Sequence, residues 1–447
     1  MFGTSGIRGE FGTEVTCDLA LSVGRAVASA GYERVVVGRD ARESGEPLQQ
    51  AVVAGLRECG ANVVDVGLAA TPTVARSIAR HDADAGVVIT ASHNPPQDNG
   101  IKLWNPSGQA FDTDQREEIT RRVREDDFDV ADWAGVGDSE RDETAVAAHE
   151  RALRDAVSID RELSVVVDAG NGPGGLTASV LHDLGCDVQT LNGQPDGRFP
   201  GRPSEPTAEN CESLTRLVAE TTADLGIAHD GDADRMMAVT EDGEFVAGDV
   251  LLALFAREAV GEGERIAAPL DTSLAVDDAL SPLGATVEHT KVGDVFVAEA
   301  ATDPAVTFGG EPSGAWIWPD ETLCPDGPLA ACKLVELVAR NDSLGALVDS
   351  VDTYPIRRDS IETPEKGAAM REVESAIRAE YETVNDLDGI RVDTDDGWFL
   401  VRPSGTQPLV RITAEARSDE RADDLFGYAR QLVTDATSAT AATTSQD

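Results

Sequence analysis

The chain has 447 residues, of which 41% are hydrophobic, enough to bury the cores of several domains of roughly 100–200 residues each. Its 82 acidic and 37 basic residues give a formal net charge of −45, which argues against nucleic acid and anionic membranes as partners. No run of residues approaches the length of a membrane span, and the first residues lack the basic and apolar regions of a signal peptide, so we expect a cytoplasmic protein.

The charge and the cysteines also bear on the protein's surroundings. The acidic residues are spread along the whole chain rather than gathered in one tail. Such a surface repels itself at low ionic strength, whereas at about 1 M salt the Debye length falls to roughly 3 Å and the repulsion is screened. We therefore interpret the charge as an adaptation to a high-salt cytoplasm. The six cysteines include no Cys-x-x-Cys pair, which argues against zinc sites and a disulfide framework.

The first predicted domain, residues 1–138, alternates helices and strands, which is typical of an α/β fold. It opens with FGTSGIRG (2–9), a glycine-rich turn whose Arg8 could meet a phosphate or a hydroxyl. The helices are expected at 17–30, 48–59 and 73–80, and the strands at 34–38, 63–66 and 85–89. The acidic segment 125–143 marks the end of this domain.

The motif TASHNPP (90–96) directly follows the last of these strands. In open α/β sheets ligands bind at the carboxyl ends of strands, so Ser92 lies where chemistry usually takes place. Serine, asparagine and proline are also ordinary turn residues, so the motif alone is equally compatible with a plain loop. A serine hydrolase is disfavoured because G-x-S-x-G is absent. Lys102 follows ten residues after the serine.

The second predicted domain, residues 139–245, carries three closely spaced carboxylates. A predicted strand at 224–228 leads into HDGDADR, in which Asp230, Asp232 and Asp234 alternate with small residues. Carboxylates this close repel one another unless a cation compensates them, and oxygen ligands favour a hard ion such as Mg²⁺.

The segment HDGDADR has two other interpretations. An EF-hand is disfavoured because its sixth position, which requires glycine, is Arg235, and strands rather than helices are predicted on both sides. A solvated acidic turn remains an alternative in so acidic a chain.

The third predicted domain, residues 246–354, again alternates strands and helices. It contains TKVGD with Lys291, and a short strand at 306–308 leads into GGEPSG. Glu311 and Ser313 offer acceptors suited to sugar hydroxyls, although the segment alone could equally be a tight turn. Because a short apolar strand leads into a polar loop for the third time, we expect three related α/β domains.

The last predicted domain, residues 355–447, is expected to be α+β. Between two of its strands lies RPSGTQP (402–408), where one arginine, two hydroxyls and a glycine-freed backbone make a phosphate cradle. A long amphipathic helix is expected at 365–381 and another at 419–433. We expect the tail from Thr434, rich in threonine, alanine and serine, to be disordered.

Together, the motifs at 90–96, 230–235, 310–314 and 402–408 resemble those of the α-D-phosphohexomutase superfamily, in the same order and over essentially the full chain. The resemblance implies an α/β fold of three topologically related α/β domains plus a C-terminal α+β domain around a central cleft. It also implies a phosphohexomutase that interconverts hexose 6-phosphate and hexose 1-phosphate through a phosphoserine enzyme and a hexose 1,6-bisphosphate, which serves as intermediate and activator.

The same resemblance implies roles for individual residues. Ser92 would carry the phosphoryl group, and with Asp230, Asp232 and Asp234 it would hold one Mg²⁺ per chain. Arg8 and Lys102 match positions near the transferring phosphate and are candidates for acid/base or charge-stabilising roles. The substrate would be bound by Lys291 near the sugar, by Glu311 and Ser313 at its hydroxyls, and by Arg402, Ser404, Gly405 and Thr406 at its phosphate.

One position departs from the pattern of the superfamily. Many relatives have a histidine where this chain has Ala315, so the acid/base role is expected to fall on Lys102 and Arg8. The motifs resemble most closely the archaeal-type phosphoglucosamine mutase branch, with phosphomannomutase and phosphoglucomutase as alternatives. A metal-dependent sugar-phosphate phosphatase and a catalytically silent sugar-phosphate-binding paralogue are alternatives from other classes. Sugar phosphates are the expected partners, and the sequence leaves the oligomeric state open.

Overall fold

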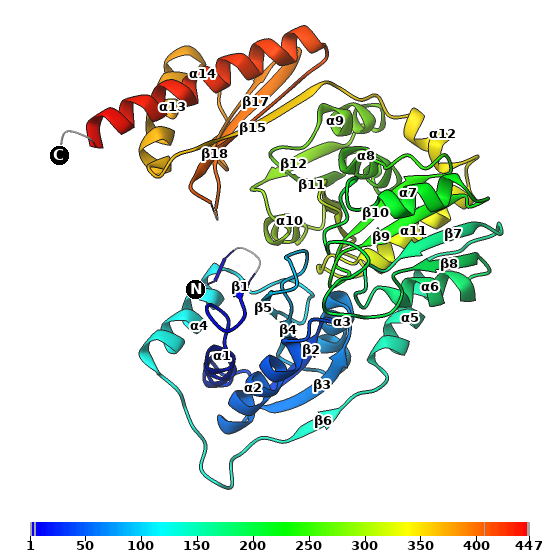
Figure 1. Ribbon diagram of the computed structural model, residues 1–447, viewed down its shortest axis with the longest axis vertical. Coiled ribbons are helices and arrows are strands. Elements are labelled where there is room, and N and C mark those ends of the chain that lie inside the picture. Colours follow the sequence, from blue (N-terminus) through cyan, green and yellow to red (C-terminus); the bar gives the residue numbers. More distant parts are fainter. Residues whose placement is uncertain (1, 4–5, 406, 445–447) are drawn as a thin grey trace.

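The computed structural model of the chain describes residues 2–3, 6–405 and 407–444. These residues form four sheets that follow one another along the chain. Figure 1 shows the four parts arranged along an arc, from the blue N-terminal part to the red C-terminal part. None of the described helices is both long enough and apolar enough to cross a bilayer.

The first sheet has six strands in the order β1-β5-β4-β2-β3-β6. Apolar side chains of α1, α2 and α4 pack on one face of this sheet and those of α3 on the other, which gives three layers. The strands are β1 (Ile7–Glu10), β2 (Arg34–Arg39), β3 (Asn62–Leu68), β4 (Ala85–Ile89), β5 (Asp98–Trp104) and β6 (Ser139–Arg141). The helices are α1 (Cys17–Ser29), α2 (Gly45–Glu58), α3 (Thr71–Arg80) and α4 (Thr113–Glu125).

Two features of this sheet differ from the expectation. The glycine-rich segment around Arg8 is the strand β1, because it pairs antiparallel with β5, on which Lys102 lies. The sheet also extends past residue 138, since β6 pairs parallel with β3.

The second and third sheets have four strands each, in the orders β10-β9-β7-β8 and β12-β11-β13-β14. The strands are β7 (Ser164–Asp168), β8 (Asp187–Leu191), β9 (Leu225–His229), β10 (Met236–Thr240), β11 (Arg265–Pro269), β12 (Thr286–Thr290), β13 (Val306–Glu311) and β14 (Ala315–Ile317). The helices are α5 (Ala145–Ala156), α6 (Gly175–Asp183), α7 (Glu212–Ala219), α8 (Gly248–Ala259), α9 (Leu274–Leu280), α10 (Asp294–Ala300), α11 (Gly327–Ala339) and α12 (Leu344–Asp349), with a 3₁₀ turn at Ser281–Leu283.

These three sheets share one topology, as the repeated strand-to-loop pattern predicts. Three parallel strands stand in the order β4-β2-β3, β9-β7-β8 and β13-β11-β12, and an antiparallel strand (β5, β10 or β14) pairs with the first of each set. The turn into that antiparallel strand carries Ser92 in the first sheet, the three aspartates in the second and Ser313 in the third. Equivalent turns of three related domains therefore supply the chemical groups.

The fourth sheet is antiparallel, in the order β15-β18-β17-β16. It consists of β15 (Ile356–Glu362), β16 (Ile390–Thr394), β17 (Gly397–Pro403) and β18 (Leu409–Ala416), and α13 (Lys366–Glu380) and α14 (Asp419–Thr444) pack on it. The prediction of a disordered tail from Thr434 was wrong up to residue 444, because α14 continues to Thr444. Alanine is the strongest helix former, and Ala436 still packs in the core of this domain.

Candidate active site

The strand-end loops open into a cleft of about 780 Å³ that runs from His93, beside Ser92, to Arg402 and Gly405 on the fourth sheet. Its lining is rich in cationic side chains, namely Arg235, Lys291, Arg358, Lys366, Arg402 and Arg411. The lining also has five acids, but six cations beside five acids is a far higher share than the 37 basic beside 82 acidic residues of the whole chain, which favours an anionic ligand.

Ser92 is held against the second domain. Its Oγ donates to Asp230 Oδ2 at 2.7 Å, and the residue is buried. Its φ of 51° lies in the left-handed region, which costs a non-glycine residue roughly 1–2 kcal/mol and therefore requires strong support from its surroundings.

Arg42 and Asp40, to which the sequence analysis assigns no role, provide that support. The buried guanidinium of Arg42 donates to the carbonyls of Ser92, Asn94, Pro95 and Asp98 at 2.6–2.8 Å, and its Nε donates to Asp40 Oδ2 at 3.0 Å. Asp40 Oδ2 also accepts from Thr90 Oγ1 at 2.7 Å, and Thr90 Oγ1 accepts from the Ser92 N–H. The loop is thus fastened at both sides of the serine. The only signal in the sequence was a charged pair directly after a buried strand.

Asp230, Asp232 and Asp234 are all buried, and one oxygen of each lies within 4.8 Å of the others. Burial, and then the charges of Asp234 and Asp232, raise the pKa of Asp230 well above its usual range. Burial and the charge of Asp232 likewise raise the pKa of Asp234. The protein's own cations, Arg235 and Lys102, offset only part of this effect, because the pKa of both carboxyls stays raised. A further cation would relieve the remaining repulsion.

An unpartnered oxygen of Asp232 is a second reason why the aspartate cluster suits a metal ion. Asp232 Oδ1 is buried and has no hydrogen-bond partner among the described residues, whereas Asp232 Oδ2 accepts from Thr71 at 2.6 Å and from Lys102 at 2.9 Å. A buried acceptor without a partner is costly and suits a cation ligand. All the atoms that the cluster offers as metal ligands are carboxylate oxygens, the ligand type that Mg²⁺ prefers. The flanking β9 and β10 are strands, which agrees with the argument against an EF-hand.

Lys102 and Arg8 lie beside this cluster. Lys102 Nζ donates to Asp232 and Asp234 at 2.9 and 2.7 Å. Burial alone would lower the pKa of Lys102, but the charges of these two aspartates raise it above its ordinary value. Arg8 lies on β1, and its Nε is buried without a hydrogen-bond partner among the described residues.

His93 is a further member of the site that sequence reasoning did not single out. Its Nδ1 lies 3.4 Å from Ser92 Oγ. Burial, followed by the charges of Arg235, Arg8 and Lys102, lowers the pKa of His93 to about 2, so its ring is neutral. The charges of three cations therefore act on the ring that lies beside the Ser92 hydroxyl, which suits a phosphoryl group there.

The sugar loop contacts the aspartate loop through the backbone. The Met236 N–H donates to the Gly314 carbonyl at 2.9 Å, and the backbones of Arg235 and Ala315 pair as an isolated antiparallel β-bridge. The Glu311 carboxylate accepts from the Gly293 N–H at 2.7 Å and from Ser313 Oγ at 3.1 Å. These contacts place Glu311 and Ser313 in the cleft.

At the other end of the cleft, the loop after β17 carries the predicted phosphate cradle. Arg402 is held only loosely, with guanidinium nitrogens 3.9 Å from Asp271 and 3.8 Å from Asp388. Lys366, which was not predicted, donates to the carbonyls of Ser404 and Gln407 at 2.5 and 3.2 Å. Gly405 lines the cleft, and Thr406 lies outside the described residues.

The structure thus brings most of the predicted residues to one cleft. Ser92, Lys102 and the three aspartates contact one another and are buried, and their chain neighbours His93 and Arg235 line the cleft. Arg402, Ser404 and Gly405 line the cleft from the fourth domain. Lys291, Glu311 and Ser313 line it as well, and Lys291 Nζ lies 5.6 Å from the centre of the Phe296 ring.

Family models of phosphoglucomutase/phosphomannomutase match four successive segments of the chain. The alpha/beta/alpha domains I, II and III match residues 1–130, 147–243 and 247–354, and the C-terminal domain matches residues 360–431.

Relatives match over nearly their whole length. The chain is 47% identical over 433 residues to a probable phosphoglucosamine mutase of Methanopyrus kandleri, covering 95% of both chains. It is 47% identical over 438 residues to another of Methanococcoides burtonii, covering 98% of this chain and 99% of the relative. Among solved structures, a phosphoglucomutase/phosphomannomutase family protein from Burkholderia thailandensis matches with a TM-score of 0.87 and 29% identity, covering 97% of this chain and 98% of that one.

Proposed function

The chain belongs to the phosphoglucomutase/phosphomannomutase family of enzymes, and from this premise we propose that it is a phosphoglucosamine mutase that interconverts glucosamine 6-phosphate and glucosamine 1-phosphate. The observation that carries the proposal is the pairing of Ser92 Oγ with Asp230 at one end of a cationic cleft whose other end holds Arg402. The choice of sugar is supported by the two relatives at 47% identity, both named as probable phosphoglucosamine mutases.

Ser92 carries the phosphoryl group in the proposed reaction. The bond between phosphorus and Ser92 Oγ breaks as a sugar hydroxyl forms its own bond to phosphorus, which yields a glucosamine 1,6-bisphosphate. The proton of the sugar hydroxyl ends on Ser92 Oγ, so the step balances. After the bisphosphate turns around, its other phosphoryl group passes back to Ser92.

The residues around Ser92 balance the charge of this transfer. Asp230, Asp232 and Asp234, with the seryl phosphate, would hold one Mg²⁺, which supplies positive charge to the transferring group. Arg8 and Lys102 are the candidates for acid/base or charge-stabilising roles, because they lie beside the serine and no histidine stands at Ala315.

The cleft also needs a site for the phosphate that is not reacting. Ser92 is fixed, so the sugar must present first one end and then the other. The Arg402 loop would hold the second phosphate in both orientations, while Glu311, Ser313 and Lys291 contact the sugar.

The charge of −45 further leads us to propose that the enzyme works in a high-salt cytoplasm. The acidic surface is compatible with such a medium because salt screens its self-repulsion.

The function is tested with purified protein and the 1- and 6-phosphates of glucosamine, glucose and mannose. Glucosamine phosphate should be turned over best, and intact-mass analysis should show a phosphoryl adduct on the peptide that contains Ser92. Ser92→Ala should complete no turnover. Preference for glucose or mannose phosphate would assign another mutase, and release of inorganic phosphate without isomerisation would assign a phosphatase.

A further inference from the structure

The proline- and glycine-rich loop 195–206 of the second domain, between β8 and α7, lies against both the Ser92 loop and the aspartate loop. Its exposed residues alternate with buried ones, which shows that one side of the loop is packed on the protein. The buried residues are Gly197, Phe199, Arg202, Ser204 and Pro206.

Asn171, which follows β7, holds this loop in place. Its Nδ2 donates to the Gln194 carbonyl at 2.9 Å, and its Oδ1 accepts from the Gly201 N–H at 3.0 Å. Its own carbonyl accepts from the Asp196 N–H at 2.9 Å. Within the loop, Phe199 has a φ of 48°, a left-handed conformation that is costly for a bulky residue. The second domain thus holds the loop in a conformation that it would not favour by itself.

Two side chains of the loop contact the Ser92 loop. The Phe199 ring packs on the guanidinium of Arg42, whose Cζ lies 5.0 Å from the centre of the ring. Ser204 Oγ donates to the Asn94 carbonyl at 2.9 Å. Because Arg42 itself donates to the carbonyls of Ser92 and Asn94, the loop supports the side chain that holds the serine.

Arg202 joins the loop to the aspartate loop. Its buried guanidinium donates through Nη2 to the carbonyl of His229, the residue before Asp230, at 2.6 Å. Through Nε it donates at 2.7 Å to Asp168 Oδ2, at the end of β7. In the first domain Arg42 likewise pairs with an aspartate after β2, the equivalent strand, and holds carbonyls of the Ser92 loop. The two domains therefore fasten their catalytic loops in the same way.

Gly231, between two of the aspartates, lies where the three loops meet. A Cβ at this position would lie 2.5 Å from the Ser92 carbonyl oxygen, closer than a side chain allows. It would also lie 3.2 Å from Ser204 Cβ and 3.3 Å from Phe199 Cζ. The aspartate loop is thus packed directly against the Ser92 backbone and loop 195–206.

The direct contact between the two catalytic loops is lost in the proposed reaction. Ser92 Oγ donates to Asp230 only while it carries a proton, so phosphorylation removes this hydrogen bond. Loop 195–206 instead contacts the backbone carbonyls of Asn94 and His229, which do not react. These contacts can therefore hold the two loops at one spacing in both states.

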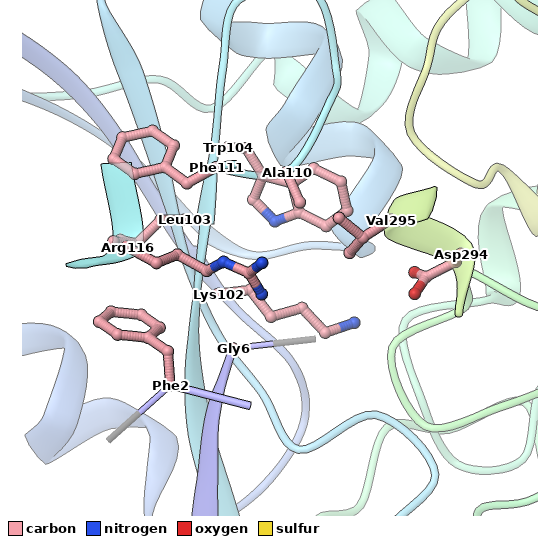
Figure 2. Close-up of a pocket in the computed structure, with 10 residues that line it drawn as sticks. All are labelled: Phe2, Gly6, Lys102, Leu103, Trp104, Ala110, Phe111, Arg116, Asp294 and Val295. Atoms are coloured by element: carbon pink, nitrogen blue, oxygen red, sulfur yellow. The ribbon is translucent and has the colours of Figure 1, made fainter. Parts of the chain in front are cut away.

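Lys102 is a further link between the first domain and the aspartates. Its Nζ donates to Asp232 and Asp234 at 2.9 and 2.7 Å. Figure 2 shows this ammonium pointing toward α10 of the third domain, where Asp294 lies. As a candidate acid/base or charge-stabilising group, Lys102 must follow the transferring phosphate, and such a group is poorly suited to fix the spacing of two loops.

We propose that loop 195–206 fixes the spacing between Ser92 and the aspartates that would hold Mg²⁺. Phe199, Arg202 and Ser204 are then positioning residues, which act through the two loops that they support. A metal ion shared by a seryl phosphate and the aspartates is bound most tightly when its ligands are held in place beforehand. This inference rests on the proposed function, because it requires a seryl phosphate.

The test measures the Mg²⁺ affinity of Phe199→Leu by calorimetry in two states. One is the enzyme phosphorylated with hexose 1,6-bisphosphate and verified by intact mass, and the other is the Ser92→Ala background, which has the aspartates alone. In the phosphorylated state, loss of the buried contact between ring and guanidinium should weaken Mg²⁺ binding about 2–30-fold. In the Ser92→Ala background the change should stay below about 2-fold, because only one of the two loops then binds the ion.

Ser204→Ala is a milder second variant, needed if the melting temperature shows that Phe199→Leu folds poorly. It removes one hydrogen bond and should weaken Mg²⁺ binding to the phosphorylated enzyme about 2–12-fold, with little change in the Ser92→Ala background. The matched control is Arg198→Gln in the same loop, because the Arg198 side chain forms an exposed ion pair with Glu43 at 2.9 Å. Its Mg²⁺ affinity should equal that of the parent protein in both states.

The outcomes separate this inference from the proposed function. If Phe199→Leu and Ser204→Ala weaken Mg²⁺ binding equally in both states, or in neither, the positioning role is overturned and the mutase assignment stands. A wild-type protein that takes no phosphoryl group on Ser92 from the bisphosphate would overturn the mutase assignment and this inference with it.

Discussion

The strongest structural prediction concerns Arg42, whose side chain makes five hydrogen bonds to the Ser92 loop and Asp40. We consider Arg42→Lys, which keeps the charge. An ammonium donates at most three hydrogen bonds, so at least two of the five bonds are lost. Asp40 Oδ2 and the carbonyls of Asn94 and Pro95 each keep another donor. The loss is therefore that of hydrogen bonds from a charged group, about 1.5–3 kcal/mol each, or about 3–6 kcal/mol for two of them. Water can replace the lost hydrogen bond at the more exposed carbonyls, so we expect a loss of stability near the lower end of this range.

The lower stability of the loop in Arg42→Lys should be accompanied by a loss of enzymatic activity. Amide hydrogen exchange of residues 90–98 reports the local stability of the loop, and mass analysis reports the phosphorylated fraction of Ser92. We expect faster exchange, a smaller phosphorylated fraction and a lower kcat. The matched control is Arg39→Lys, because Arg39 donates a single hydrogen bond at 3.2 Å, to the Asp40 carbonyl, and should cost less than about 1 kcal/mol.

Equal exchange rates at residues 90–98 in Arg42→Lys and in the wild type would refute this reasoning. So would a phosphorylated fraction and a kcat that match those of Arg39→Lys. Either result would mean that the left-handed conformation of Ser92 persists without the guanidinium.

Three further predictions address the metal, the clamp and the charge. Asp232→Asn should weaken Mg²⁺ binding and lower turnover with the fold intact, and unchanged wild-type turnover after thorough chelation would contradict the metal assignment. In a Ser92→Ala background, Arg402→Ala should weaken the calorimetric affinity for both the 1-phosphate and the 6-phosphate by about 10–150-fold, and a loss for only one of them would place the clamp elsewhere. The melting temperature should fall as potassium chloride is lowered from about 1 M to about 0.01 M, where the Debye length grows to roughly 30 Å, whereas a constant value would speak against salt adaptation.

The strands that end at the site could be predicted because they are short, apolar and locally defined. The strand expected at 85–89 is β4 (Ala85–Ile89), and the aspartate loop follows β9. The rule that ligands meet strand ends marked the position of Ser92, and the resemblance to the phosphohexomutases implied that Ser92 and Asp230 share one site. In the structure Ser92 Oγ lies 2.7 Å from Asp230 Oδ2.

Other parts depend on contacts between distant residues, which a local pattern does not contain. The role of Arg42 arises from carbonyls about fifty positions further along the chain. Lys366 supports the phosphate loop only because α13 begins beside it. The strand β1 forms because its glycine-rich residues pair with β5, far away in the sequence. The composition of the tail does not contain the contact of Ala436 with the core of the fourth domain, so it predicts disorder where α14 continues.

The geometry of the cleft also bears on how an enzyme of this charge could capture its substrate. At about 1 M salt, a Debye length of roughly 3 Å removes long-range steering of a phosphate toward Arg402 or Arg235. Contacts inside the protein are screened much less, and Lys102 is nearly buried with its ammonium 2.7–2.9 Å from two aspartates. In such a medium, affinity must therefore come from direct hydrogen bonds at both ends of the ligand. The proposed division between a serine on the first domain and a phosphate-binding loop on the fourth would meet that requirement.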